Sequence, residues 1–367
     1  MNKAPNSGKC GGMLLAVALL VWTQAAPVHA ASTLNAQAHE ILAENFSEDG
    51  PGAAVAVLKN GRLVVEAHLG LADIERGIAI NSNTVFDLAS VSKQFTAASV
   101  LLLEADGEID LNRAIKDYLP DYRVRSPGRP VRVSDLVLHV SGLPDYCSDD
   151  FDENDNSFGE LTTETHLQWL NTVRPHGRPG ISYVYNNSGY ALLSLLIERV
   201  SGQSYANFVS ERLFLPAGMR RTRVMDDATL HFPHQTRGYK SDEDGNAELS
   251  EEPSSTTGDG NVYSNLKDMI AWMRALDGDA VLSAAQKRRA FAPGKLDSGA
   301  MIEDEGEGYG YGWVIEAPGR VSHSGSWRGT ATFIARDRKE ALSVVVLSND
   351  ESADVASIAA ALAELVR

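Results

Sequence analysis

Strand-forming segments lie at the two ends of this chain and helix-forming segments lie between them, a distribution that constrains the fold. The segment 53–70, AAVAVLKNGRLVVEAHLG, predicts a β-hairpin, because two apolar runs flank Asn60-Gly61, a dipeptide that favours tight hairpin turns. Further strands are predicted at 309–317, 330–337 and 341–350. Strands from both ends are most simply explained by one sheet.

The middle of the chain carries helical patterns instead. VSDLVLHVSG, TETHLQWLNTV and SGYALLSLLIERVSG all have apolar residues at helical spacing. Additional helices are predicted at 35–46, 90–104, 264–276 and 354–367. We therefore expect an α+β fold in which residues 31–110 and 251–367 form an antiparallel sheet flanked by helices. Residues 111–250 are expected to form an inserted all-helical domain, with the active site in the cleft between the two.

The first thirty residues resemble a signal peptide. Lys3 and Lys9 precede the ten-residue apolar stretch 13–22, which is too short to span a bilayer, and small residues precede a cut after Ala30. A buried core helix is the alternative. We expect an exported protein, periplasmic or secreted, with no membrane span in the mature chain.

Charge and cysteine content exclude several kinds of partner and site. Cleavage after Ala30 takes the net charge from −16 to −18, which argues against binding nucleic acid or anionic membranes. Only Cys147 then remains, so neither an intrachain disulfide nor a multi-cysteine zinc site is expected. The acidic segments 148–160 and 241–252 fit no calcium-binding loop and are expected at the solvated surface.

The pair Ser90 and Lys93 forms an S-x-x-K motif at a predicted helix start. At this spacing both side chains share one face of a helical turn, so the lysine can help a serine hydroxyl lose its proton. The motif alone is weak, since Ser264 and Lys267 repeat it, and there Ser264 is also readily explained as a helix N-cap. Ser92 is an alternative to Ser90 as the N-cap of the helix predicted at 90–104.

Tyr185 and Asn187 lie just before the helix that begins near Gly189. In an extended segment their spacing points both side chains the same way. A phenol near a lysine can act as a base or proton relay, and an amide can bind a substrate carbonyl or N–H group. A core tyrosine and a capping asparagine are the structural alternative.

The late segment VSHSGSWRG contains a third polar group. His323 can offer a hydrogen bond or positive charge to a substrate carboxylate or to the tyrosine, and Gly325 allows a close backbone approach. The backbone N–H of Ser326 can pair with that of Ser90 as an oxyanion hole. A structural histidine is the alternative.

Taken in order, these motifs resemble the serine β-lactamase and penicillin-binding protein superfamily. Within it, the chain is most similar to the branch of class C β-lactamases, D,D-carboxypeptidases and family VIII esterases. LVLHVSGLPDY resembles the H-T-S-G-L stretch of that branch, YNNSGYALL its Y-S-N-x-G-Y stretch, and YGYGW and VVVLSN its late strands. The similarity covers about residues 45–367.

The resemblance implies both a fold and a set of roles. The fold is an antiparallel sheet with helices on both faces beside an all-helical domain. Ser90 would be the acylated nucleophile, Lys93 its activator and Tyr185 the base or proton relay. Asn187 would hold the substrate amide, while His323 and Gly325 would replace the K-T-G motif. Ser264 would have no catalytic role.

Two departures from the class C pattern bear on substrate choice: His323 replaces a lysine and Ser324 a threonine. An imidazole binds a carboxylate less firmly than an ammonium, which argues against efficient β-lactam hydrolysis. Val140, where threonine is common, is interpreted as a packing residue.

The sequence therefore predicts an exported serine hydrolase that forms an acyl-enzyme on an amide or ester carbonyl and needs no metal or organic cofactor. Its substrate could be an ester, a D-amino-acid amide or peptide, or a β-lactam. A family VIII carboxylesterase and a non-hydrolysing penicillin-binding protein are the alternatives. An α/β-hydrolase is disfavoured, because the chain lacks G-x-S-x-G.

Overall fold

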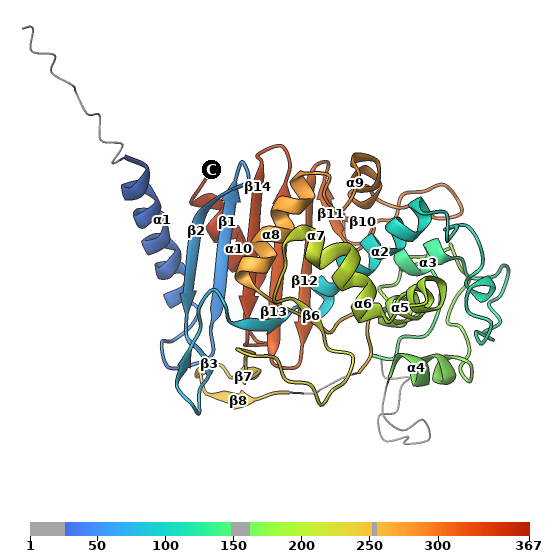
Figure 1. Cartoon of the computed structure of the whole chain (residues 1–367), viewed down its shortest axis with the longest axis horizontal. Helices are drawn as coiled ribbons and strands as arrows, with labels where there is room; N and C mark the ends of the chain where they lie inside the picture. Colours follow the sequence, from blue (N-terminus) through green and yellow to red (C-terminus); the bar gives the residue numbers. More distant parts are fainter. Residues whose placement is uncertain (1–25, 148–161, 252–254) are drawn as a thin grey trace, which may run out of the picture.

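The computed structural model describes residues 26–147, 162–251 and 255–367 (Figure 1). Their largest element is a seven-stranded antiparallel sheet in the order β10-β11-β12-β13-β14-β1-β2. Its strands are β1 (Ala53–Lys59), β2 (Arg62–Leu69), β10 (Gly308–Tyr309), β11 (Val314–Ala317), β12 (Arg320–Trp327), β13 (Thr330–Asp337) and β14 (Leu342–Ser348).

The sheet joins the two ends of the chain, as the sequence predicts. The strand β1 pairs with β14 in one unbroken antiparallel register from Ala53 opposite Ser348 to Lys59 opposite Leu342. The turn between β1 and β2 holds Asn60 and Gly61 at positive φ, 53° and 70°, as a type I′ hairpin requires.

The remaining strands form three small sheets. They are β3 (Leu71–Asp73) with β4 (Ile78–Ala79); β5 (Val85–Asp87), β9 (Val262–Asn265) and β6 (Arg223–Val224); and β7 (Tyr239–Ser241) with β8 (Ala247–Leu249). The range predicted as all-helical therefore also contains β6, β7 and β8. In the described part of the acidic segment 241–252, the side chains between β7 and β8 are exposed.

Ten α-helices lie in the described residues. They are α1 (Ala26–Ala43), α2 (Lys93–Ala105), α3 (Val133–Val137), α4 (Thr163–Leu170), α5 (Asn187–Ser201), α6 (Tyr205–Val209), α7 (Leu215–Ala217), α8 (Leu266–Asp277), α9 (Ala284–Ala290) and α10 (Val355–Glu364). The described residues also contain two short 3₁₀ helices, η1 (Ala89–Ser92) and η2 (Ile115–Asp117), and a short π-helix, η4 (Ser210–Phe214).

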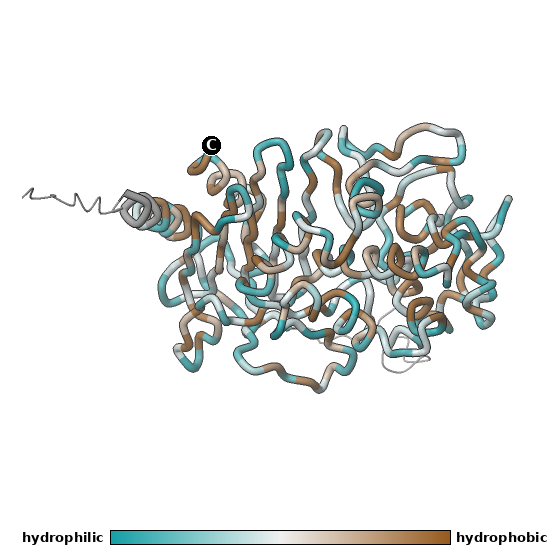
Figure 2. Tube along the Cα trace, turned by 45° about the horizontal axis from the view of Figure 1, so that its top comes forward, coloured by the Kyte–Doolittle hydropathy of each residue, from teal (hydrophilic) through white to brown (hydrophobic). Residues whose placement is uncertain are grey.

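Helices cover both faces of the sheet (Figure 1). Alternate residues of β1 point to opposite faces. Val55 and Val57 pack with α1 and α10, whereas Ala54 and Ala56 belong to the larger core that contains α2 and α8. Figure 2 shows the hydrophobic segments gathered along the strands and inner helices, with hydrophilic residues in the turns.

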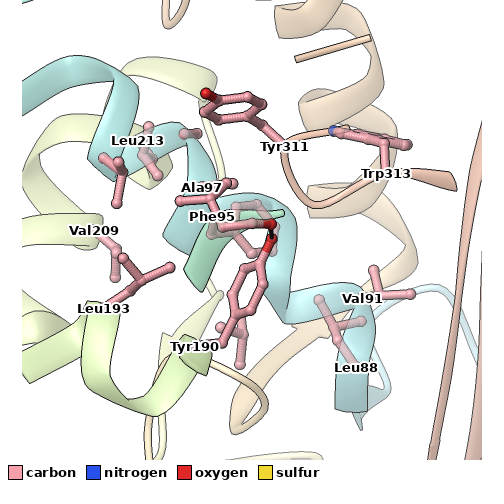
Figure 3. Packing of buried hydrophobic residues seen from close by; sticks show 14 of the residues in the cluster. Leu88, Val91, Phe95, Ala97, Tyr190, Leu193, Val209, Leu213, Tyr311 and Trp313 are labelled. Atoms are coloured by element: carbon pink, nitrogen blue, oxygen red, sulfur yellow. Dashed lines mark hydrogen bonds between the residues drawn. The ribbon is translucent and has the colours of Figure 1, made fainter. Parts of the chain in front are cut away.

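The helix α2 lies at the centre of the larger core and is buried along most of its length. Phe95 packs edge-on against Phe214 with ring centroids 5.2 Å apart, and Figure 3 places it and Ala97 among Tyr190, Leu193 and Val209. This packing holds the first turn of α2 rigidly between the sheet and the helical part of the chain.

Several predicted helix boundaries shift in the structure. The first helix begins at Ala26 rather than 35, so the expected cleavage position after Ala30 falls within α1, while residues 1–25 of the expected signal peptide 1–30 lie outside the described residues. The most informative difference concerns Ser264, predicted as an N-cap. It is instead a residue of β9, and Asn265 caps α8 by accepting the N–H of Asp268.

Candidate active site

Ser90 lies on the one-turn segment η1 between β5 and α2, rather than on the helix itself. Ala89, directly before it, has a φ of 45°, a left-handed conformation that costs energy for a residue with a Cβ. The Asp87 carboxylate accepts the Ala89 N–H at 2.8 Å and so helps to hold this strained turn. Burial raises the pKa of Asp87 to about 6.

The sheet supports the same turn from the other side. Thr330 and Thr332 of β13 donate their hydroxyls to the carbonyls of Asp87 and Leu88, at 3.0 and 2.8 Å. A Cβ at Gly325 would lie 2.3 Å from the Leu88 carbonyl oxygen, so only glycine fits there. The close approach expected at Gly325 is therefore an approach of β12 to the turn that carries Ser90.

Lys93 is fully buried and directed at Ser90. Its Nζ lies 3.0 Å from Ser90 Oγ, 2.8 Å from Asn187 Oδ1 and 2.8 Å from the carbonyl oxygen of Asp259. The last two oxygens can only accept hydrogen bonds, so they fix two hydrogens of the amine. The third position faces Ser90 Oγ, which can receive a hydrogen from an ammonium or give its own to a neutral amine.

Tyr185 and Asn187 are brought to the same place. The Tyr185 ring is 5.0 Å from Lys93 Nζ, and its side chain remains 36% exposed. Asn187 is the first residue of α5, and Asp145 accepts both its backbone N–H and its Nδ2–H. Asn187 thus holds Lys93 through Oδ1 while Asp145 holds Asn187.

His323 is placed differently from its expected role. It is only 3% exposed, and both ring nitrogens have partners inside the protein. Nδ1 lies 2.6 Å from the Ser324 carbonyl oxygen and so carries the proton, which leaves Nε2 to accept from the Tyr309 hydroxyl at 3.1 Å. Burial and the charge of Lys93 lower the pKa of His323 to about 4, so the imidazole is neutral at pH 7.

A cavity of about 240 Å³ opens in front of Ser90. Its lining includes Ser90, Tyr185, Asn187 and Ser326 from the set expected from sequence. Lys93, His323 and Gly325 do not line it: Lys93 lies behind Ser90, and β12 presents its exposed Ser326 rather than His323. Within the described residues, this lining contains the carboxylates of Asp87 and Asp259 but no lysine or arginine.

Three supporting residues were not singled out from the sequence. Asp259 accepts a hydrogen bond from Lys93 through its backbone carbonyl and another from Tyr146 through its carboxylate. Asp145 accepts the backbone N–H of Asn187. The Tyr309 hydroxyl forms a hydrogen bond with Nε2 of His323. Asp145 and Tyr309 lie inside quoted motifs, LVLHVSGLPDY and YGYGW, but nothing in their spacing signals a partner more than ten residues away.

The competing nucleophiles are placed less favourably. Ser92 is fully buried and accepts the Val262 N–H, so it does not cap α2 through its side chain. Cys147 is exposed at the cavity, but partial desolvation of its thiol and the carboxylates of Asp259 and Asp145 raise the pKa of that thiol, which disfavours the thiolate.

Neither a metal-binding cluster nor a membrane-spanning helix is found in the part of the chain that the structure describes. There, no group of three His, Cys, Asp or Glu residues is arranged to hold a metal ion. No helix among the same residues is both long and apolar enough to cross a membrane.

The sequence of this chain matches the model of a known protein family. The model described as Beta-lactamase matches residues 38–367, which is nearly all of the described chain. The chain belongs to the beta-lactamase family. This membership confirms the resemblance drawn from the three motifs and the α+β fold expected with it.

Relatives within the beta-lactamase family include peptidases and penicillin-binding proteins. Penicillin-binding protein 4* of Bacillus subtilis is 32% identical over 85% of this chain and 70% of its own length. A D-aminopeptidase of Brucella anthropi is 31% identical over 82% of this chain. The match spans only 56% of that relative's length, so this beta-lactamase-family chain corresponds to just over half of it.

The fold is also found in a solved structure. The octameric penicillin-binding protein homologue from Pyrococcus abyssi matches with a TM-score of 0.78 and 26% identity, over 91% of this chain and 77% of that one. These beta-lactamase-family relatives identify the chain as a serine hydrolase.

Proposed function

We propose that the protein hydrolyses amides or esters of D-amino acids whose reacting residue carries no free carboxylate. Hydrolysis would proceed through an acyl-enzyme on Ser90. The observation that carries this proposal is the charge of the cavity. Its described lining has two carboxylates and no lysine or arginine, and the nearby imidazole of His323 is neutral.

The charge distribution separates substrate classes. β-Lactams and the C-terminal residue of a carboxypeptidase substrate carry a carboxylate close to the reacting carbonyl. Burying that anion in a cavity whose described lining offers no lysine or arginine is unfavourable, and the carboxylates of Asp87 and Asp259 add repulsion. Neutral esters, amides and substrates with a free α-ammonium group avoid this cost. The D-aminopeptidase relative is consistent with the last class.

Acylation would use the residues that meet at the start of α2. Ser90 Oγ attacks the carbonyl carbon as its proton passes toward Lys93 or Tyr185, and the C–O bond forms while negative charge develops on the carbonyl oxygen. The backbone N–H groups of Ser90 and Ser326 would stabilise that oxygen. Breakdown of the tetrahedral intermediate expels the amine or alcohol, which takes up the proton.

Deacylation would reverse these roles with water. Tyr185 is the more exposed of the two proton acceptors, so it would draw the proton from the attacking water while Lys93 stays bonded to Asn187 and Asp259. Hydrolysis of the acyl-enzyme releases the acid and restores Ser90. Export of the enzyme, expected from residues 1–30, is part of the same proposal.

A substrate panel on the purified protein tests the proposal. D-Phenylalanine amide and D-alanine p-nitroanilide represent the proposed substrates, p-nitrophenyl butyrate represents a neutral ester without a D-amino acid, and nitrocefin and an acetylated peptide ending in D-alanyl-D-alanine represent carboxylate-bearing substrates. We expect kcat/KM at least about tenfold higher for the first group, a difference of about 1.4 kcal/mol. Faster turnover of nitrocefin or of the D-alanyl-D-alanine peptide would contradict it.

The panel also separates the alternatives left open by the sequence. Turnover of p-nitrophenyl butyrate with no turnover of either D-amino-acid amide would favour a family VIII type carboxylesterase. Stoichiometric labelling by a fluorescent penicillin, without turnover of any of the substrates, would instead indicate a non-hydrolysing penicillin-binding protein.

A further inference from the structure

The histidine of LVLHVSGLPDY has no part in the mechanism above, yet it lies directly beside the site. His139 follows α3, is 1% exposed and has a φ of 56°. A left-handed backbone is uncommon at residues other than glycine, although histidine adopts it more readily than most, and it has an energetic cost that surrounding contacts must offset. Strain of this kind concentrates at functional sites.

His139 forms hydrogen bonds with the residues on both sides of Tyr185. Its carbonyl oxygen accepts the Val184 N–H at 2.9 Å, and its ring nitrogen Nδ1 accepts the Asn186 N–H at 3.0 Å. The chain before and after Tyr185 is therefore fastened to one residue. Fixing both neighbours restricts the backbone dihedrals that aim the Tyr185 side chain.

The ring of His139 also supports the face of Tyr185. Their ring centroids are 4.3 Å apart at an interplanar angle of 33°, and Tyr190 and Tyr309 surround the imidazole at 4.9 and 4.7 Å. Tyr185 thus lies between this aromatic group and the buried Nζ of Lys93, 5.0 Å from its ring. Its position is set from two directions.

The protonation state of His139 suits this arrangement. Nδ1 accepts a backbone N–H, so the ring proton is on Nε2. Burial, together with the charge of Lys93, holds the pKa of His139 well below its usual range. The ring therefore stays neutral and remains an acceptor for the Asn186 N–H.

We infer that His139 is a positioning residue that orients Tyr185 for proton transfer through its hydrogen bonds to Val184 and Asn186 and through ring stacking. The inference rests on the proposed role of Tyr185. His139 does not touch the reacting atoms. Its loss should slow acylation while leaving substrate binding nearly unchanged, since a displacement of about 1 Å in a reacting group can cost about a hundredfold in rate.

Two variants separate positioning from folding. His139→Gly and His139→Asn both tolerate a positive φ, so neither adds backbone strain. Asparagine also supplies an oxygen near the place of Nδ1, whereas glycine supplies no acceptor. We expect kcat for p-nitrophenyl butyrate, and the acylation rate by a fluorophosphonate probe, to fall about a hundredfold in His139→Gly with KM within about threefold. His139→Asn should recover at least a tenth of the wild-type rate.

A double variant tests whether His139 acts through Tyr185. In a Tyr185→Phe background, His139→Gly should cause little further loss, because the group it positions is already gone. Additive losses would overturn the inference, as would equal losses in His139→Asn and His139→Gly that follow a fall in Tm. If Tyr185→Phe lowers the rate but His139→Gly does not, only the inference fails. If Tyr185→Phe acylates at the wild-type rate, the Ser90 proton passes to Lys93 alone, and the proposed role of Tyr185 in acylation fails together with this inference.

Discussion

The chain contains two S-x-x-K segments with the same spacing and opposite surroundings. Ser90 lies on η1 and Lys93 begins α2, so both are on one continuous helical turn and their side chains meet at 3.0 Å. Ser264 lies on β9 and Lys267 on α8, with the change from strand to helix between them. Equal spacing in sequence therefore gives contact in one case and separation in the other.

The separated pair has different partners. Ser264 is fully buried and its hydroxyl bonds to that of Thr222 at 2.8 Å, while Lys267 bonds to Asn83 in an exposed position. Neither lines the cavity in front of Ser90. The comparison teaches that the spacing predicts chemistry only where the backbone is helical across all four residues and where a cavity opens at the serine.

The largest expected effect comes from removing the two serines in turn. Ser90→Ala should reduce labelling by a fluorophosphonate or fluorescent penicillin at least about a thousandfold, because the acylated oxygen is gone. Ser264→Ala should label at the wild-type rate. Gel fluorescence of both variants, with the intact mass of the labelled protein, checks this. Persistent labelling of Ser90→Ala would refute the assignment of the nucleophile.

The two lysines should differ almost as strongly. Lys93→Met should lower the acylation rate by about 10²–10⁴-fold, the range typical for loss of an acid–base group, whereas Lys267→Met should leave it unchanged. Stopped-flow measurement of acylation at pH 7 compares the two. Similar losses in both variants would mean that the rate reports stability rather than chemistry.

Acid should lower the stability of the folded protein through His323, which lies near Ser90. Its pKa is about 4 in the folded protein, against 6.5 as a free side chain. Stability is therefore fully present above pH 6.5 and falls as the pH drops toward 4, because only the unfolded state takes up the proton. The loss from this residue is about 2 kcal/mol at pH 5.

Urea unfolding at pH 7 and pH 5 measures this difference. The variant His323→Gln should be less stable at pH 7 but should lose less between the two pH values than the wild type. His139 and His166, also buried with lowered pKa values, contribute with the same sign, whereas Asp87, with its raised pKa, contributes with the opposite sign. If His323→Gln lost as much unfolding free energy as the wild type between pH 7 and pH 5, the loss could not be assigned to His323.

The smallest effect concerns the stability contributed by the second pair. Ser264→Ala removes a buried hydrogen bond to Thr222 and should cost about 1 kcal/mol of unfolding free energy. Turnover should not change. Chemical denaturation and a kcat/KM measurement on the same sample test both halves, and a loss of turnover without a loss of stability would contradict the proposed structural role.

Local patterns predicted the framework of this molecule well. The hairpin at Asn60-Gly61, the strands predicted at 330–337 and 341–350 and the helix capped by Asp354 depend on short-range turn chemistry and periodicity, and all are present. The segment 309–317, predicted as one strand, is instead divided between β10 and β11. Ser264 was wrong as an N-cap, because β9 pairs with both β5 and β6. Those partners are far away in sequence, so local pattern does not reveal them.

The site was predictable in its principal side chains but not in its connections. Ser90, Tyr185, Asn187 and Ser326 do gather at one cavity. The burial of His323 was not foreseeable. Inside the protein its two ring nitrogens form hydrogen bonds with the Tyr309 hydroxyl and the Ser324 carbonyl, and the sequence does not reveal these partners. Motif order indicates which residues meet, whereas burial, which sets their charge, depends on the packing around them.

The pairing of β1 with β14 has a consequence for synthesis. β14 is synthesised some three hundred residues after the hairpin of β1 and β2, yet it joins β13 to that hairpin. Until it emerges, the β1–β2 hairpin has no neighbour in the main sheet, and contacts of such long sequence separation form slowly. A chain cut before β14 should therefore be unable to acylate, and in a growing chain activity should appear only after β14 has emerged.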